Sequence, residues 1–268
     1  MRRKAAVAGY FYPQREKELR KMIRDMVDPG KKKEKSIGVV SPHAGYVYSG
    51  PVAGAVFSSV QLPERFVILG PSHRGMASRI AIMREGVWEM PFGDVPVDSE
   101  LADLITKSSG IISEDSEAHL HEHSLEVQLP FIQFFKQNFS IVPVCVASSA
   151  AFEELEELGK AIARAAREKK QEVMVVASTD MSHYIQQEIA EKKDFMAINK
   201  ILELDAKGLY EVVSDEGISM CGFQPTTSAV VACKALGASS AELIKYQTSG
   251  DITGDYSEVV GYSGIRIK

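Results

Sequence analysis

Three histidines lie just after apolar, β-branched runs, at the points where such runs would end as buried strands. They are His43 after Val39-Val40, His73 after Val67-Ile68-Leu69, and His183 a few residues after Val175-Val176-Ala177. Imidazole binds transition metals and transfers protons near neutral pH. Proline and glycine near His43 and His73 restrict the backbone or let it approach a ligand closely. Because the carboxyl ends of parallel strands line one crevice, this placement predicts a shared site.

Four further polar residues could belong to the same site. Asp180 stands three residues before His183, and Glu122 and His123 directly precede a predicted helix. A metal-binding histidine commonly needs a carboxylate or carbonyl on its second ring nitrogen, a role open to Glu122 or Asp180. Cys221 lies in "SMCGFQP", ahead of another predicted helix. There the pKa of a thiol can fall, which would produce a nucleophile or a metal ligand.

The elements that must position these residues are strands and helices in alternation. The apolar runs are continuous rather than alternating, which is typical of strands covered by helices on both faces. They comprise residues 37–40, 66–69, 141–146 and 173–177. Residues 257–267 are expected to form one or two closing strands, broken at Gly261 and Gly264. The alternation predicts one α/β domain over residues 1–268, with a mixed, largely parallel central sheet.

The segments between these runs have the spacing of amphipathic helices. One apolar stripe covers residues 19–27, and another covers 152–166, with glutamates early and basic residues late. A third stripe follows Pro51, which we expect to be the first residue of its helix. Further helices are expected from Ser124 and near Pro225.

Some residues of chemically useful types are assigned to structure instead. Cys145 lies in a predicted strand and Cys233 on an inward helix stripe, so both are expected to be core residues. His119 and His121 are expected in an exposed polar loop. Trp88 is expected to pack in the core, although it could also wall a binding pocket.

Composition excludes several classes of protein. The 268 residues are 45% hydrophobic and 25% charged, with a net charge of −5, so a nucleic-acid-binding surface is not expected. No apolar stretch approaches the roughly 20 residues needed to span a membrane. The N-terminus lacks the pattern of a signal peptide, and three cysteines do not suggest a disulfide framework. We therefore expect a cytoplasmic protein.

Seven motifs together resemble the Memo-like protein family. They are "AGYFYP" at 8–13, "PHAGYVYSG" at 42–50, "LGPSH" at 69–73, "PFGDVPVD" at 91–98, "EHSLEVQLPF" at 122–131, "STDMSHY" at 178–184 and "CGFQP" at 221–225. The resemblance keeps the same order from residue 8 to about residue 263. It implies a three-layer α/β/α sandwich around a mixed sheet, similar to class III extradiol dioxygenases, which are non-haem iron enzymes.

The resemblance also implies roles for individual residues. His43, His73 and Cys221 match metal-binding positions of the family. Asp180 and His183 match polar residues beside the metal, and His183 matches a catalytic base of the dioxygenases. With these two, Glu122 and His123 complete the catalytic candidates. The aromatic residues Phe11 and Tyr48 match positions that line the family's pocket.

A thiolate at Cys221 in place of the dioxygenases' carboxylate leaves the metal and the reaction open. Sulfur favours copper(I), zinc or a different iron chemistry, so one iron, copper or zinc ion is expected. The leading hypothesis is an oxidoreductase that acts with this single ion. A zinc-dependent hydrolase and a non-catalytic binding or signalling module are the alternatives. In each case a small molecule or peptide would bind in the pocket at the strand ends.

Overall fold

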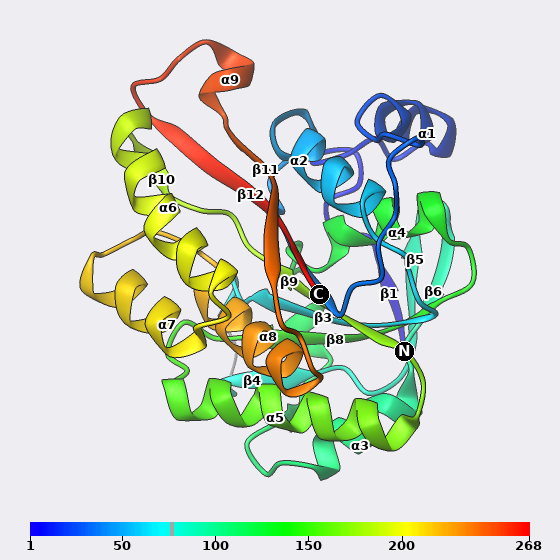
Figure 1. Ribbon diagram of the computed structural model, residues 1–268. Coiled ribbons are helices and arrows are strands. Elements are labelled where there is room, and N and C mark those ends of the chain that lie inside the picture. Colours follow the sequence, from blue (N-terminus) through cyan, green and yellow to red (C-terminus); the bar gives the residue numbers. More distant parts are fainter. Residues whose placement is uncertain (76–77) are drawn as a thin grey trace.

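The computed structural model describes residues 1–75 and 78–268, and within them its centre is a mixed, nine-stranded sheet (Figure 1). Its strands are β2 (Gly38–Ser41), β3 (Arg65–Pro71), β4 (Ile80–Ile82), β7 (Ser113–Glu114), β8 (Ser140–Val146), β9 (Val173–Ser178), β10 (His183–Ile185), β11 (Ala241–Thr248) and β12 (Val259–Ile267). Their order is β10-β12-β2-β9-β3-β8-β4-β7, and β11 pairs with β12. The neighbours β2, β9, β3 and β8 are parallel, whereas β12 is antiparallel to β2 and β4 is antiparallel to β8.

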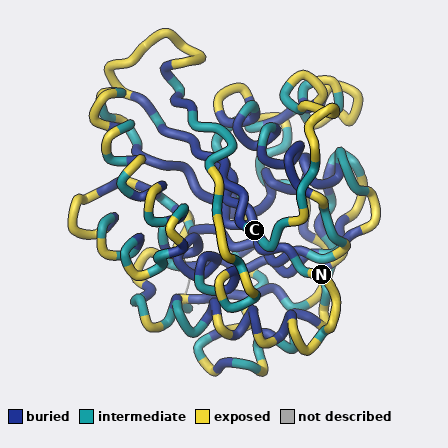
Figure 2. The backbone as a smooth tube through the Cα atoms, in the orientation of Figure 1, coloured by how far each residue is buried: buried dark blue, intermediate teal, exposed yellow. Residues whose placement is uncertain are grey.

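The four predicted apolar runs form these central parallel strands. Successive side chains of a strand point to opposite faces, so a strand covered on both faces is apolar throughout. In β2, Val40 faces one hydrophobic cluster and Val39 faces the other, and both are buried. Figure 2 shows the same pattern, with buried strands at the centre and exposed loops around them.

Helices cover both faces of the sheet and confirm the predicted α/β/α sandwich. The first face packs against α3 (Ser99–Lys107), α5 (Phe152–Lys169), α6 (Gln187–Leu202), α7 (Ala206–Asp215) and α8 (Phe223–Ala235). The second packs against α1 (Glu16–Arg24), α2 (Tyr46–Ser58) and α4 (Leu129–Phe135). A three-stranded sheet of β1 (Arg2–Lys4), β5 (Val87–Met90) and β6 (Gly93–Pro96) joins this second layer. Trp88 of β5 is fully buried there, as predicted, and its Nε1–H points to the sulfur of Met83.

The prediction that Pro51 begins a helix is wrong, because α2 starts five residues earlier, at Tyr46. Two tertiary hydrogen bonds hold that first residue. The Tyr46 N–H donates to the Phe11 carbonyl at 2.8 Å, and its hydroxyl donates to the Val127 carbonyl at 2.5 Å. Pro51 therefore lies inside the helix, where its missing N–H removes one helical hydrogen bond.

The closing strand is also different from the prediction. β12 continues through Gly261 and Gly264 without the expected breaks. Both glycines are required by close packing: a Cβ on Gly264 would lie 2.9 Å from Val56 of α2, and one on Gly261 would collide with Asp194 of α6. The segment expected to become helical at Ser124 forms a 3₁₀ turn, η2 (Glu126–Gln128), followed by α4. Within residues 1–75 and 78–268, none of the helices has the length and hydrophobicity of a membrane-spanning segment.

Candidate metal centre

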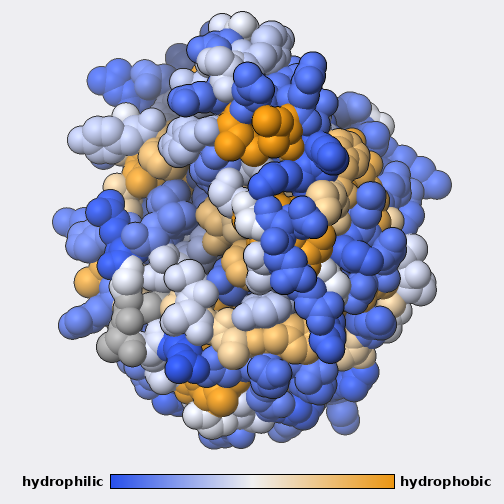
Figure 3. All heavy atoms as spheres, turned by 90° about the vertical axis from the view of Figure 1, so that its left-hand side faces the viewer, coloured by the Kyte–Doolittle hydropathy of each residue, from blue (hydrophilic) through white to orange (hydrophobic). Residues whose placement is uncertain are grey.

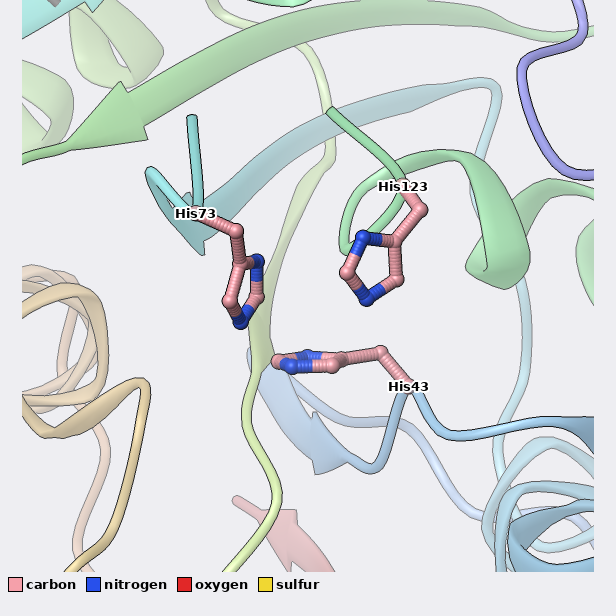
Figure 4. A group of neighbouring side chains, drawn as sticks. All are labelled: His43, His73 and His123. Atoms are coloured by element: carbon pink, nitrogen blue, oxygen red, sulfur yellow. The ribbon is translucent and has the colours of Figure 1, made fainter. Parts of the chain in front are cut away.

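Three imidazole rings meet at the carboxyl edge of the parallel strands (Figure 4). His43 follows β2, His73 follows β3, and His123 lies in the segment before η2. One ligand atom from each ring can be chosen so that all three lie within 4.8 Å of one another. The ring centroids of His43 lie 5.3 Å from His73 and 5.5 Å from His123, and those of His73 and His123 lie 4.6 Å apart. In the described part of the chain this is the group of side chains best placed to hold a metal ion.

The strand order explains why His43 and His73 converge. β9 lies between β2 and β3, and the three strands are parallel, so the loops that follow them leave the sheet at the same edge. His43 is only 2% exposed, and its main-chain N–H donates to Asp180 Oδ1 at 2.7 Å in the loop after β9. The backbone around His43 is therefore held by the loop that follows the neighbouring strand.

Ser178, the last residue of β9, fixes the tautomer of His43. The Ser178 hydroxyl donates a hydrogen bond to the Ser124 carbonyl, with 2.6 Å between the oxygens. It must therefore accept from His43 Nδ1, which lies 3.0 Å away. With the proton on Nδ1, the lone pair of His43 Nε2 is free for a metal.

Glu122 fixes His73 in the same way. This carboxylate is fully buried and accepts the His73 ring Nδ1–H at 2.9 Å and the His73 main-chain N–H at 2.7 Å. Its Oε1 also accepts the Ser124 N–H at 2.8 Å and lies 3.5 Å from His123 Nδ1. A carboxylate behind a metal-binding imidazole orients the ring and makes it a stronger ligand.

Burial and neighbouring charges keep these groups in the forms that a metal requires. Burial lowers the pKa of His43 well below its ordinary value, and it lowers the pKa of His123 to about 4. Burial also opposes ionisation of Glu122, but the hydrogen bonds from His73 and Ser124 outweigh it and hold the pKa of that carboxyl well below normal. Near pH 7 the neutral rings of His43 and His123 therefore lie beside the ionised carboxylate of Glu122.

Cys221 lies beside the cluster, with its Sγ 3.2 Å from His43 Nε2. It precedes α8, as expected from the sequence. The expected fall in its pKa is not found, because burial and the negative charge of Asp180 raise the pKa of the thiol. The Asp180 N–H approaches the same sulfur at 3.3 Å. The thiol therefore faces the same His43 nitrogen that a metal would use.

Asp180 and His183 line the same cavity as the cluster. Burial raises the pKa of Asp180 to about 6, although the His43 N–H stabilises its ionised form. His183 begins β10, and its Nδ1 lies 2.9 Å from the Ser219 carbonyl, which can only accept a hydrogen bond. The proton therefore sits on Nδ1, and His183 Nε2 can accept another proton.

A cavity of about 690 Å³ opens onto the cluster. The three histidines of the cluster, Asp180 and His183 line it, together with the aromatic side chains of Phe11, Tyr48, Tyr184 and Tyr262. Residues of the segment between β11 and β12 complete the wall, among them Asp255 and Glu258. Phe11 packs edge-on against His123, with 4.9 Å between the ring centroids.

The molecular face drawn in Figure 3 is mostly hydrophilic, with hydrophobic side chains in separate patches.

The donor set fits one transition-metal ion. Three imidazole nitrogen donors, with a cavity beside them, suit iron, copper or zinc and leave positions for a ligand. The orientation of His43 and His73 is set by protein partners and does not require an ion. The histidines would hold the ion through nitrogen, and Cys221 could add or replace a donor next to His43.

Sequence reasoning placed His123 among the catalytic candidates and missed that it completes a three-histidine group. The only sequence signal was its position beside Glu122. His119 also differs from the prediction of an exposed loop: it is fully buried, and its ring nitrogens lie 2.9 Å from the Asp115 carbonyl and 3.2 Å from the Pro143 carbonyl. His121 is exposed, as predicted.

Comparisons with known proteins agree with the sequence motifs. A family model described as "Memo-like protein" matches residues 3–266. A MEMO1 family protein of Methanopyrus kandleri is 46% identical, covering 99% of this chain and 98% of its own. One from Methanothermobacter thermautotrophicus is 43% identical, covering 98% and 99%. The crystal structure of an uncharacterized Escherichia coli K12 protein matches with a TM-score of 0.59 at 12% identity, covering 87% of this chain and 100% of its own, a likeness of fold alone.

Proposed function

The chain belongs to the Memo-like protein family, and from this premise we propose that it is a metal-dependent oxidoreductase. In this proposal His43, His73 and His123 hold one transition-metal ion, and a small molecule binds beside it in the cavity. The observation that carries the proposal is the convergence of three imidazoles at that cavity, two of them with Nδ1–H bound to protein acceptors so that Nε2 carries the lone pair.

The residues around the ion have separate tasks. When bound, a redox-active ion at this site supplies electron transfer and polarises oxygen or the substrate. His183 accepts a proton from the substrate at Nε2, while the Ser219 carbonyl holds its Nδ1–H. Asp180 fixes the His43 backbone and can exchange a proton near neutral pH, because burial raises its pKa to about 6. Phe11 and Tyr48 form the apolar walls that orient an organic ligand and displace water.

A zinc-dependent hydrolase is the second candidate, and the donor set itself favours it. Three histidines and a water molecule form a known catalytic zinc site, in which the pKa of the water falls to about 7. His183 would then act on the hydrolytic water. Dependence on oxygen separates the two functions, since oxidation consumes oxygen or another electron acceptor and hydrolysis does not. A fully loaded protein that binds ligands in the cavity but turns over none would instead support a binding module.

The proposal is tested by anaerobic reconstitution with Fe²⁺, Cu⁺ or Zn²⁺, followed by metal analysis. We expect one equivalent of metal in the wild type, and little in His73→Ala or His123→Ala. His121→Ala is the matched control, because His121 is an exposed histidine two residues from His123, and it should bind as the wild type does. Negligible metal in the wild type, or equal metal in all four proteins, would refute the proposed site.

The role of Cys221 needs its own variant, because the sequence predicted a ligand set of His43, His73 and Cys221. We expect Cys221→Ser to keep the ion on three histidines. Substitution with Co²⁺ gives the readout: a thiolate ligand produces strong near-ultraviolet charge-transfer absorption, and imidazoles do not. Such a band in the wild type, lost in Cys221→Ser together with metal binding, would support the set that contains Cys221.

A further inference from the structure

A buried arginine lies behind the metal centre and contacts the segment that carries Glu122 and His123. Arg3 of β1 is 1% exposed. Its Nε donates to the His119 carbonyl at 2.7 Å, its Nη2 to the Glu122 carbonyl at 2.6 Å, and its Nη1 to Glu126 at 2.6 Å. The guanidinium also lies 3.9 Å from the centroid of the Trp88 ring. The planar, forked guanidinium reaches three acceptors along one segment, which the single ammonium of lysine cannot do.

Glu126 extends this network to the N-terminal loop that carries the pocket residue Phe11. The carboxylate is fully buried and accepts hydrogen bonds from the Ala6 N–H at 2.7 Å, the Val7 N–H at 3.1 Å and the Tyr12 hydroxyl at 2.5 Å. Phe11 lies between these contacts and packs against His123. The Arg3–Glu126 pair thus ties together the two segments that form one side of the site.

The contacts lead step by step to the metal ligands. Arg3 holds the main chain of Glu122, and the Glu122 side chain holds both the ring and the backbone of His73. His123 lies in the chain between Glu122 and Glu126, two of the three residues of this segment that Arg3 binds. We propose that the buried Arg3–Glu126 ion pair positions the metal centre, because it fixes the segment that supplies one ligand and orients another. This inference rests on the proposed metal site.

A merely structural ion pair would give a different result on mutation. Removing one partner of a buried ion pair lowers the stability of the fold, whether the pair is purely structural or also positions the metal ligands. Only a positioning pair also changes the metal affinity of the folded protein. Loss of an outer-shell partner of a metal ligand weakens binding by about 10–100-fold. Arg3 is one contact further away, so we expect about tenfold weaker binding when its fork is lost.

The decisive comparison is Arg3→Lys against Arg266→Lys. Arg266 is an equally suitable buried arginine, 4% exposed, which donates to the Ser59 carbonyl at 2.9 Å and pairs with Glu242 at 2.6 Å. It lies in β12, and its partners Ser59, Glu242 and Glu34 lie outside the metal centre, so its loss should affect stability alone. The measurements are urea unfolding of the metal-free proteins and Zn²⁺ affinity by competition with a chelator. We expect both variants to be less stable, and Arg3→Lys alone to bind Zn²⁺ about tenfold more weakly.

Two further measurements keep the inference open to refutation. If Arg3→Lys does not fold, Tyr12→Phe removes a single donor to Glu126 and should still weaken Zn²⁺ binding. If the wild type binds no metal, the proposed function fails, but nuclear magnetic resonance of the metal-free histidine rings still tests positioning. Arg3→Lys should then shift the ring signals of His73 and His123 and leave those of His121 unchanged. Zn²⁺ affinities equal to that of Arg266→Lys, or unchanged ring signals, would overturn the inference.

Discussion

Replacement of Glu122 by glutamine tests the reasoning about the site most directly. Both carboxylate oxygens accept N–H groups: Oε1 accepts the His73 ring Nδ1–H and the Ser124 N–H, and Oε2 accepts the His73 main-chain N–H. A glutamine has one oxygen and one NH₂ group. In either orientation its NH₂ must face an N–H, and two donors cannot bond to each other. Glu122→Gln therefore removes the negative charge and leaves a buried donor unpaired.

The contacts set the size of both effects. An unsatisfied buried donor costs about 1–3 kcal/mol, so the free energy of unfolding should fall by that amount. Loss of the carboxylate behind His73 should weaken metal binding by about 10–100-fold, which corresponds to about 1.4–2.8 kcal/mol. The assays are urea unfolding of the metal-free protein and Zn²⁺ competition with a chelator.

Glu154→Gln is the matched control for this experiment. Glu154 lies in the first turn of α5. It also accepts a main-chain N–H, that of Ala151 at 2.9 Å, and it forms an ion pair with Arg79. Its contacts do not include the histidine cluster, so metal affinity should stay at the wild-type value. Glu122→Gln with wild-type Zn²⁺ affinity would show that the carboxylate does not orient His73 for a metal.

Three further predictions concern other parts of the molecule. His183→Asn should lower the turnover of an identified substrate by about 10²–10⁴-fold at unchanged metal affinity, as loss of a proton-transfer group requires; equal turnover would exclude His183 as the base. Burial raises the pKa of Asp194, so wild-type stability should fall as pH rises from about 4 through that raised pKa, and urea unfolding should show no such component in Asp194→Asn. Gly159→Ala should cost about 1–3 kcal/mol in thermal unfolding, because its Cβ would lie 2.6 Å from the Ser228 carbonyl and from Val231, although alanine favours the helix by about 1 kcal/mol. A more stable Gly159→Ala would show that α5 and α8 can separate at little cost.

Local patterns were enough to predict the central strands. A run such as 173–177 is apolar on both faces, and only a strand covered by helices explains such a run in a short segment. Local patterns failed where a distant contact set the boundary. Pro51 has the features of a helix start, yet α2 begins at Tyr46, because Phe11 and Val127 accept hydrogen bonds from that residue.

The site was predictable to the same degree and for the same reason. His43 and His73 follow parallel strands, and strand direction alone brings their loops to one edge. His123 follows no such strand. Its place in the cluster depends on the fold of the segment from Glu122 to Glu126, which Arg3 contacts although about 120 residues separate them in the chain. His119 shows the converse error, because a polar sequence hid a ring that is buried, with a main-chain carbonyl facing each of its nitrogens.

The tautomers of the histidines show how these distant contacts could serve one chemistry. His43, His73 and His183 each donate a hydrogen bond from Nδ1–H to a different acceptor. The acceptors are the Ser178 hydroxyl, the Glu122 carboxylate and the Ser219 carbonyl, respectively. None of these acceptors depends on a metal ion, so folding alone sets the tautomer that places the lone pair on Nε2. Metal binding then loses little conformational entropy of the histidine side chains, so more of the binding energy contributes to affinity. Because hydrophobic clusters on both faces hold the sheet, the metal should stabilise the fold only by mass action, in proportion to the logarithm of its concentration over its Kd.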